Sequence, residues 1–207
     1  AGEHHISGNL EPGKRPLTMW EMSQMIGISR TPVREAVIQL SEESRIIEIF
    51  PQRGMRIALI DVDLVEEARF LRLVLEKAAV ELVCGQADEE DLQWLDENIR
   101  LQEFYLEGGS SRKLLELDNE MHRKLFSICR KELTYEMCQR LAIHYDRIRS
   151  LSVAAVKDHK IIEDHKKLLE AIRSRDKKLA AETMDLHLNR WMMNEQMFRN
   201  QYPAYFK

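Results

Sequence analysis

Hydrophobic and polar positions follow two different patterns, one before and one after about residue 60. In the first part the period changes: Val33, Val37 and Leu40 repeat at helical spacing, and Ile47-Glu48-Ile49 then alternates as a strand does. Beyond residue 62, long segments carry apolar residues at intervals of three and four, without sustained strand alternation. The pattern predicts a mainly α protein with a small N-terminal domain over 1–60 and an all-α domain over 61–207.

The N-terminal part carries the signals of two consecutive short helices. Thr18-Met19-Trp20-Glu21 fits a capping box at the start of the first helix, and Gly27 ends it. Ser29 or Thr31 can cap a second helix, whose first turn tolerates Pro32. Two helices joined by a short glycine-containing turn predict a helix-turn-helix.

A β-hairpin is predicted directly after the second helix. Ile47–Ile49 and Met55–Leu59 are the expected strands, and Pro51-Gln52-Arg53-Gly54 is the turn between them. A hairpin in this place makes the domain a winged helix-turn-helix. Such a domain puts the start of its second helix into the major groove of DNA.

Candidate DNA contacts follow from this geometry. They lie at the start of the second helix and at the wing tip, and are Ser29, Arg30, Thr31, Arg34, Arg53 and Gly54. Arginine can pair with guanine edges or clamp phosphate. The same spacing also fits solvated surface charges that pair with Glu35 or Glu42. Residues 1–60 carry seven basic and seven acidic side chains, so DNA binding must depend on a few placed cations rather than bulk charge.

These residues resemble a known family. Ile28-Ser29-Arg30-Thr31-Pro32-Val33-Arg34-Glu35-Ala36 resembles the recognition helix of GntR-family bacterial regulators, and Gly8–Gly13 and Pro51–Gly54 match its flanks. The resemblance implies DNA binding through Arg30, Thr31, Arg34 and Gly54. Two positions depart from the family pattern.

Both departures concern the helix-turn-helix. Trp20 stands where family members usually carry arginine, so a base contact is missing or altered. Arg45 replaces the glycine that usually follows the recognition helix.

Composition narrows the class of protein. The net charge of the 207 residues is -4, and the longest run without a charged residue, Met22–Ser29, is far shorter than the roughly 20 residues that cross a bilayer. We therefore expect no membrane association. The three cysteines lack CxxC spacing, which favours reduced thiols and a cytoplasmic location.

The C-terminal part is predicted to be an antiparallel bundle of about six helices. The expected helices are Asp63–Gln86, Glu89–Leu106, Ser110–Arg130, Thr134–Val156, His159–Arg173 and Asp176–Asn200.

Four polar residues interrupt the apolar stripes of this bundle. Asp118 and His122 are four residues apart and share an inward helical face, and His165 and His187 also lie beside apolar positions. If the four converge, three imidazoles and one carboxylate suit a divalent ion such as Zn²⁺, Ni²⁺ or Mn²⁺ and leave one or two coordination positions open. The alternative is that these histidines are ordinary hydrogen-bonded core residues.

A second resemblance bears on that choice. Leu117-Asp118…His122…Phe126, Glu163-Asp164-His165 and Ala180…Met184…His187-Leu188 look like the FCD effector domain of the FadR-like branch, and six helices are closer to its VanR-like variant. The likeness implies metal ligation by Asp118, His122, His165 and His187, with zinc as the first choice. It also implies a small carboxylate effector at the open position.

Arg72 is the candidate for binding the effector carboxylate, because a guanidinium matches a carboxylate with two parallel hydrogen bonds. Arg72 and Glu76 also match the first helix of the FCD pattern. The alternative role of Arg72 is an ion pair with Glu76, four residues on.

Together these features predict a transcriptional regulator rather than an enzyme. We expect a homodimeric repressor that binds a near-palindromic double-stranded DNA operator and responds to the carboxylate. A metal-dependent helical hydrolase is one alternative, although the chain has no HExxH-type motif, P-loop or nucleophile elbow. A metal-free helical interaction module with a DNA-binding head is another.

Overall fold

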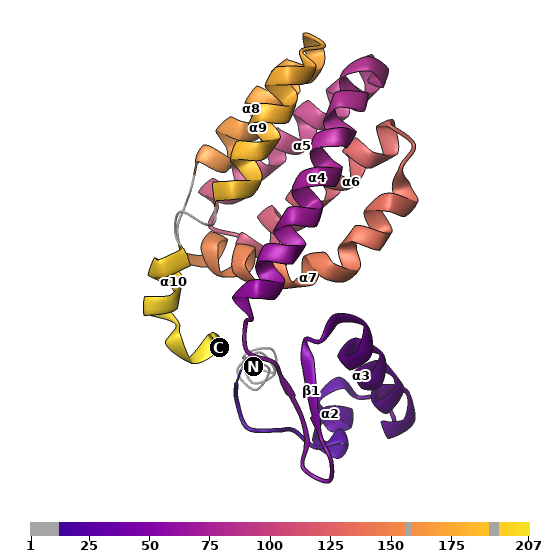
Figure 1. The fold of residues 1–207 in the computed structure, drawn as a ribbon, viewed down its shortest axis with the longest axis vertical. Coiled ribbons are helices and arrows are strands. Elements are labelled where there is room, and N and C mark those ends of the chain that lie inside the picture. Colours follow the sequence, from indigo (N-terminus) through magenta and orange to yellow (C-terminus); the bar gives the residue numbers. More distant parts are fainter. Residues whose placement is uncertain (1–12, 156–158, 191–194) are drawn as a thin grey trace. The chain divides into compact units, whose positions relative to one another are not determined.

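The computed structural model describes residues 13–155, 159–190 and 195–207, and these form two compact units (Figure 1). One unit contains residues up to 64 together with 197–207, and the other contains residues 65–196. The second unit was expected to begin at residue 61 and to include the C-terminus. The hydrophobic pattern does not indicate that residues 197–207 pack with the first unit. No helix in the described residues is long and apolar enough to cross a membrane.

The first unit begins with the predicted pair of helices, α2 (Met19–Ile26) and α3 (Arg30–Ser44). The Thr18 side chain accepts a hydrogen bond from the Glu21 amide, and the Glu21 carboxylate accepts one from the Thr18 amide, which completes the capping box. Gly27 adopts the left-handed conformation and ends α2. Ser29 is the N-cap residue of α3, although its side chain makes no capping hydrogen bond.

The wing is the antiparallel pair β1 (Ile47–Phe50) and β2 (Gly54–Ile57). Arg53 closes the turn by donating its amide to the carbonyl of Phe50 at 3.0 Å. Leu17 adds a short bridge to the other edge of β2 through reciprocal backbone hydrogen bonds with Met55. The core between these helices and strands is apolar and consists of Leu17, Met22, Val33, Val37, Ile47 and Met55.

The end of the chain joins this first unit. After α10 (Glu195–Gln201), a short 3₁₀ turn at Pro203–Tyr205 leads into a parallel bridge between Phe206 and Ile60. The Ile60 amide donates to the carbonyl of Tyr205 at 2.6 Å, and the ammonium of Lys207 pairs with Asp61 at 2.7 Å. The segment that follows the wing is therefore held by the C-terminus.

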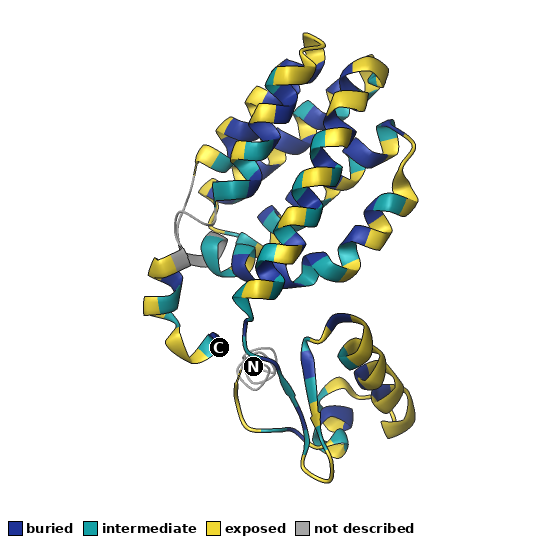
Figure 2. Cartoon of the chain, in the orientation of Figure 1, coloured by how far each residue is buried: buried dark blue, intermediate teal, exposed yellow. Residues whose placement is uncertain are grey.

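The second unit is a bundle of long helices. They are α4 (Val62–Gln86), α5 (Glu89–Glu107), α6 (Ser111–Ile128), α7 (Glu132–Ala155), α8 (Lys160–Arg173) and α9 (Lys177–Asn189). α5 packs against both α6 and α8, α7 packs against α6, and α9 packs against α8. Buried residues line the inner side of each helix and exposed residues the outer side (Figure 2).

The observed boundaries agree with the predicted bundle to within a few residues for five of its helices. The predicted end of the fourth, Val156, lies outside the described residues. The last predicted helix, Asp176–Asn200, corresponds to α9 and α10, with residues 191–194 between them outside the described part.

Candidate metal centre and nucleic-acid interface

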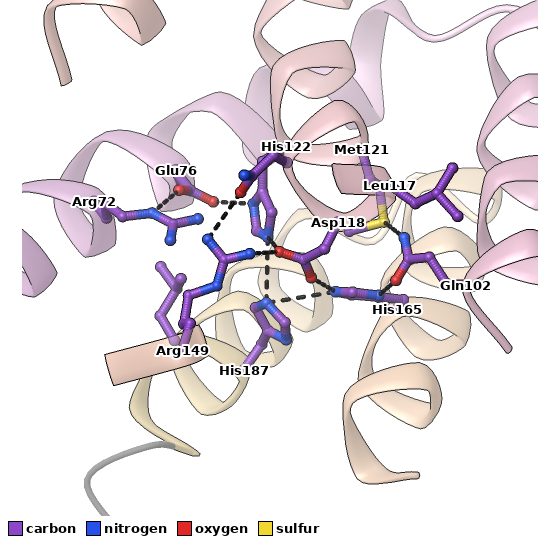
Figure 3. Close-up of polar contacts among 12 residues, drawn as sticks. Arg72, Glu76, Gln102, Leu117, Asp118, Met121, His122, Arg149, His165 and His187 are labelled. Carbon is purple, nitrogen blue, oxygen red and sulfur yellow. Dashed lines mark hydrogen bonds and ion pairs between the residues drawn. The ribbon is translucent and has the colours of Figure 1, made fainter. Parts of the chain in front are cut away.

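Three helices of the bundle bring the four predicted ligands together (Figure 3). Asp118 and His122 project from successive turns of α6, His165 from α8 and His187 from α9. One ligand atom from each lies within 4.8 Å of those of the others, and the group is almost completely buried. The predicted convergence is thus present in the fold.

The separations between the donor atoms are those of a metal coordination sphere. His187 Nε2 lies 3.3 Å from His122 Nε2 and 3.4 Å from His165 Nε2. The Asp118 carboxylate lies 3.4 Å from His165 Nε2 and 3.7 Å from His122 Nε2. An ion with bonds of about 2.0–2.1 Å places tetrahedral ligands about 3.3–3.4 Å apart.

Hydrogen bonds behind the ring of ligands fix the tautomers of two histidines. His122 Nδ1 contacts the Glu76 carboxylate, and His165 Nδ1 lies 2.9 Å from the Gln102 amide oxygen. Both partners are acceptors. The ionised Glu76 carboxylate has no proton to donate, and Gln102 presents its amide oxygen to His165 because its amide nitrogen donates to Asn98. Each Nδ1 must therefore carry the proton, which leaves the Nε2 lone pair pointing into the site.

These tautomers create an excess of acceptors at the centre. The Nε2 lone pairs of His122 and His165 converge here with Asp118 Oδ1, and His187 can offer them one N–H at Nε2. The other oxygen of Asp118 accepts a hydrogen bond from Arg149. One imidazole N–H cannot satisfy these three converging acceptors, and unsatisfied buried polar atoms are costly. A bound cation resolves this arrangement, so the residues present fit a divalent metal.

The ionisation states also suit metal binding. Burial alone would raise the pKa of Asp118, but the Arg149 guanidinium and the surrounding imidazoles hold it well below its usual value. Burial lowers the pKa of His165 to about 4 and that of His187 well below its usual value. An ionised carboxylate and neutral imidazoles are the forms that bind metals.

His187 differs from the other two imidazoles. Its Nδ1 has no hydrogen-bond partner among the described residues and lies 3.9 Å from Asp164 Oδ2. Arg190 holds Asp164 with two hydrogen bonds, one of them 2.6 Å long. The ring of His187 is therefore less firmly oriented than those of His122 and His165.

Arg72, the candidate for effector binding, is almost completely buried and makes the ion pair that was its alternative role. Its Nε donates to Glu76 at 2.7 Å, and its guanidinium lies 5.0 Å above the ring of Tyr145. Burial would raise the pKa of Glu76, but Arg72 and His122 lower it to about 2. Arg72 thus keeps ionised the carboxylate that orients His122, and its contact with an effector stays a prediction.

Two residues of this site carry weaker signals in the sequence. Gln102 lies on the apolar stripe of α5 formed by Leu95, Ile99 and Leu106, and a polar residue in such a stripe is the signal that identifies it. Arg149 contacts Asp118 from α7, and its position in the sequence does not reveal that contact.

The structure places the predicted DNA contacts on the outside of the first unit. Ser29, Arg30, Thr31 and Arg34 are all exposed at the start of α3, whereas Val33 and Val37 face the core. Within the described residues neither Arg30 nor Arg34 forms an ion pair, so the proposed pairing with Glu35 or Glu42 is absent there. Arg53 is exposed in the wing turn.

Gly54 has a structural reason to be glycine. Its φ is +104°, and a Cβ built there would lie 2.2 Å from the carbonyl oxygen of Leu17. Only glycine permits the close approach of β2 to the segment at Leu17. A contact between Gly54 and DNA remains a prediction.

Both departures from the family pattern are visible in the fold. Trp20 is 53% exposed on α2, and Arg45 ends α3 in the left-handed conformation with φ of +55°. The backbone at residue 45 thus has the conformation for which the family uses glycine.

Comparison with known proteins decides the family. The sequence profile of the FCD domain matches residues 67–190, and that of the bacterial regulatory proteins of the gntR family matches residues 3–57. The chain belongs to the GntR family. It is a DNA-binding transcriptional regulator of the FadR-like branch, with an FCD C-terminal domain.

Relatives of this GntR regulator share most of its length. The HTH-type transcriptional repressor RspR of Escherichia coli (strain K12) is 28% identical over 198 residues, which cover 95% of this chain and 86% of that protein. The structure of E. coli McbR/YncC aligns with a TM-score of 0.77 at 22% identity, covering 97% and 94% of the two chains. A GntR-family regulator from Pseudomonas syringae aligns with a TM-score of 0.56 at 23% identity, covering 95% and 82%. The relatives are regulators, which confirms the expectation of a regulator rather than an enzyme.

Proposed function

We propose that this GntR-family regulator is a repressor controlled by a small carboxylate, which binds a divalent metal held by Asp118, His122, His165 and His187. Zn²⁺ is the first candidate, with Ni²⁺ or Mn²⁺ as alternatives. The name of RspR as a repressor supports the direction of control. The protein would act in the cytoplasm, where its operator lies.

The observation that carries this proposal is the convergence of four electron-pair donors in a buried site with too few N–H groups. The contacts from Glu76 and Gln102 aim the Nε2 lone pairs of His122 and His165 inward. When bound, the metal would supply a Lewis-acid centre, and expansion of its coordination beyond the four protein ligands would admit a carboxylate oxygen.

DNA recognition is assigned to the exposed start of α3, with Ser29, Arg30, Thr31 and Arg34, and to Arg53 and Gly54 in the wing. Replacing Arg34 by alanine should weaken binding about tenfold or more, measured with a duplex that the wild-type protein selects from a random pool. Arg112→Ala removes an exposed arginine of α6 and is the control. Equal losses in both variants would contradict the assignment.

We also propose that the protein is a homodimer. Phe70 and Val74 lie one turn apart on α4 and are 63% and 50% exposed, and Leu133 and Met137 repeat this spacing on α7. Apolar pairs of this kind on the surface of a helix suit a self-complementary interface. Two copies would bring two copies of α3 to successive major grooves.

Coupling between the effector site and the DNA-binding unit has two routes along the chain, of which the second is completed by hydrogen bonds and an ion pair. One is the segment from Ile60 to Asp63, which enters α4. The other starts at His187 in α9 and ends in the C-terminal residues that pair with Ile60 and Asp61. A shift of α9 on effector binding would therefore reach the segment that follows the wing.

Metal analysis of the full chain tests the proposal. After loading with zinc and removal of free ions, the wild-type protein should retain about one ion per chain, and acetate should raise its melting temperature further. His187→Ala should retain no stoichiometric zinc, whereas His159→Ala, at an exposed histidine before α8, should behave as wild type. A wild-type protein that retains no metal would instead be a helical interaction module with structural histidines.

A further inference from the structure

Arg149 lies directly against the candidate metal ligands (Figure 3). Its Nη2 donates to Asp118 Oδ2, and its Nη1 donates to the side chains of Asn119 at 2.9 Å and Asp146 at 2.6 Å. The side chain is only 12% exposed. A fixed positive charge therefore sits on the carboxylate that would ligate the metal.

The two buried arginines of this region differ in what they contact. Arg72 pairs with Glu76, which in turn contacts the candidate ligand His122. Arg149 contacts a candidate ligand without an intermediate. Asp146 lies between the two, 3.9 Å from Arg72 and 2.6 Å from Arg149. Arg72 is thus a positioning residue, and Arg149 is the cation nearest to the ligand carboxylate.

The balance of charges in this cluster is informative. Two arginines face three carboxylates, those of Glu76, Asp118 and Asp146, so one negative charge is in excess. A divalent cation would reverse this to one excess positive charge. One carboxylate group would then make the cluster neutral, which its buried members favour; Asp146, at 32% exposure, is the most exposed of the five members.

We propose that Arg149 makes metal and effector bind cooperatively, and that the effector presents a single carboxylate to it. The guanidinium of Arg149 opposes a second cation beside Asp118 when no anion is present. Once a carboxylate is bound, Arg149 donates to it and the opposition is removed. This inference rests on the proposed function, since it requires a metal at the four ligands.

The test measures zinc affinity of the full chain by competition with a chromophoric chelator, with and without acetate as the probe. In the wild type, acetate should raise zinc affinity roughly 5- to 150-fold. In Arg149→Gln, zinc affinity without acetate should be about tenfold higher than in the wild type, and acetate should change it less than about twofold. Arg140→Gln, at an exposed arginine of α7, should match the wild type.

A second variant, Arg149→Lys, keeps the inference testable if Arg149→Gln fails to fold. Arg149→Lys keeps the charge but loses the planar fork, so its zinc affinity without acetate should stay within about threefold of wild type while the acetate effect shrinks. Weaker zinc binding in Arg149→Gln would overturn the inference, because it would mean that Arg149 only orients Asp118. An undiminished acetate effect in that variant would also overturn it. A wild type that binds no zinc would overturn both this inference and the proposed function.

Discussion

The two units of the chain place their polar side chains in opposite ways. The DNA-binding unit has an apolar core around Met55 and keeps Arg30 and Arg34 on its surface. The helical unit instead buries ionisable side chains at its centre, among them His122 and His165. Burying such groups costs solvation free energy that hydrogen bonds and opposite charges offset only in part. Among the residues that the structure describes, burial of this kind is confined to the helical unit, which indicates where a ligand is needed.

The mutation with the largest expected effect on stability tests whether the apolar core alone holds the DNA-binding unit together. Met55 is 2% exposed, so Met55→Ala should destabilise this unit by about 2–5 kcal/mol. Amide hydrogen exchange should increase at α2, α3 and the wing and stay unchanged in α5, α6 and α8.

Ile38→Ala is the control for this experiment. Ile38 belongs to α3 but is exposed, so its truncation should change stability by no more than about 0.5 kcal/mol. Faster exchange throughout the bundle in Met55→Ala would break the comparison, because the two units would then unfold together.

The next effect concerns the polar centre of the helical unit. Gln102→Leu removes the amide oxygen that fixes the tautomer of His165, and it also removes the hydrogen bond that Gln102 donates to Asn98. Zinc affinity should therefore fall about 10- to 100-fold. Equilibrium titration with a competing chelator measures this loss. Gln102→Glu keeps an acceptor at the same place and should restore most of the affinity.

Gln93→Leu provides the matched control on the same helix. Gln93 is exposed and hydrogen-bonds to Glu97, away from the four candidate ligands, so its replacement should leave zinc affinity unchanged. If Gln102→Leu also left the affinity unchanged, the buried hydrogen bonds of this unit would serve stability rather than a ligand.

Features that depend on neighbouring residues could be predicted from the sequence. The capping box at Thr18 and Glu21, the end of α2 at Gly27 and the shared face of Asp118 and His122 all involve residues at most four apart. Local hydrogen bonds and helical geometry determine such features, and the structure shows them as expected.

The distant contacts that support the site, and the pairing of the C-terminus, could not be predicted. The contact of Glu76 with His122 spans 46 residues, and that of Gln102 with His165 spans 63. The pairing of Ile60 with Phe206 joins segments at opposite ends of the chain. The packing of helices fixes these contacts, and hydrophobic periodicity reveals which face is buried but not which helix covers it.

The smallest effect sharpens the comparison at the surface of the DNA-binding unit, where α3 ends. Arg45 holds the left-handed conformation with φ of +55°, which a Cβ disfavours. Arg45→Gly removes that strain but adds freedom to the unfolded chain, so the net gain in stability should be about 0.5–1 kcal/mol. Thermal unfolding and hydrogen exchange at α3 measure it. Arg45→Ala removes the same charge but keeps the Cβ and should give no gain; an equal gain in both variants would mean that the charge of Arg45, rather than its backbone, is the source of the strain.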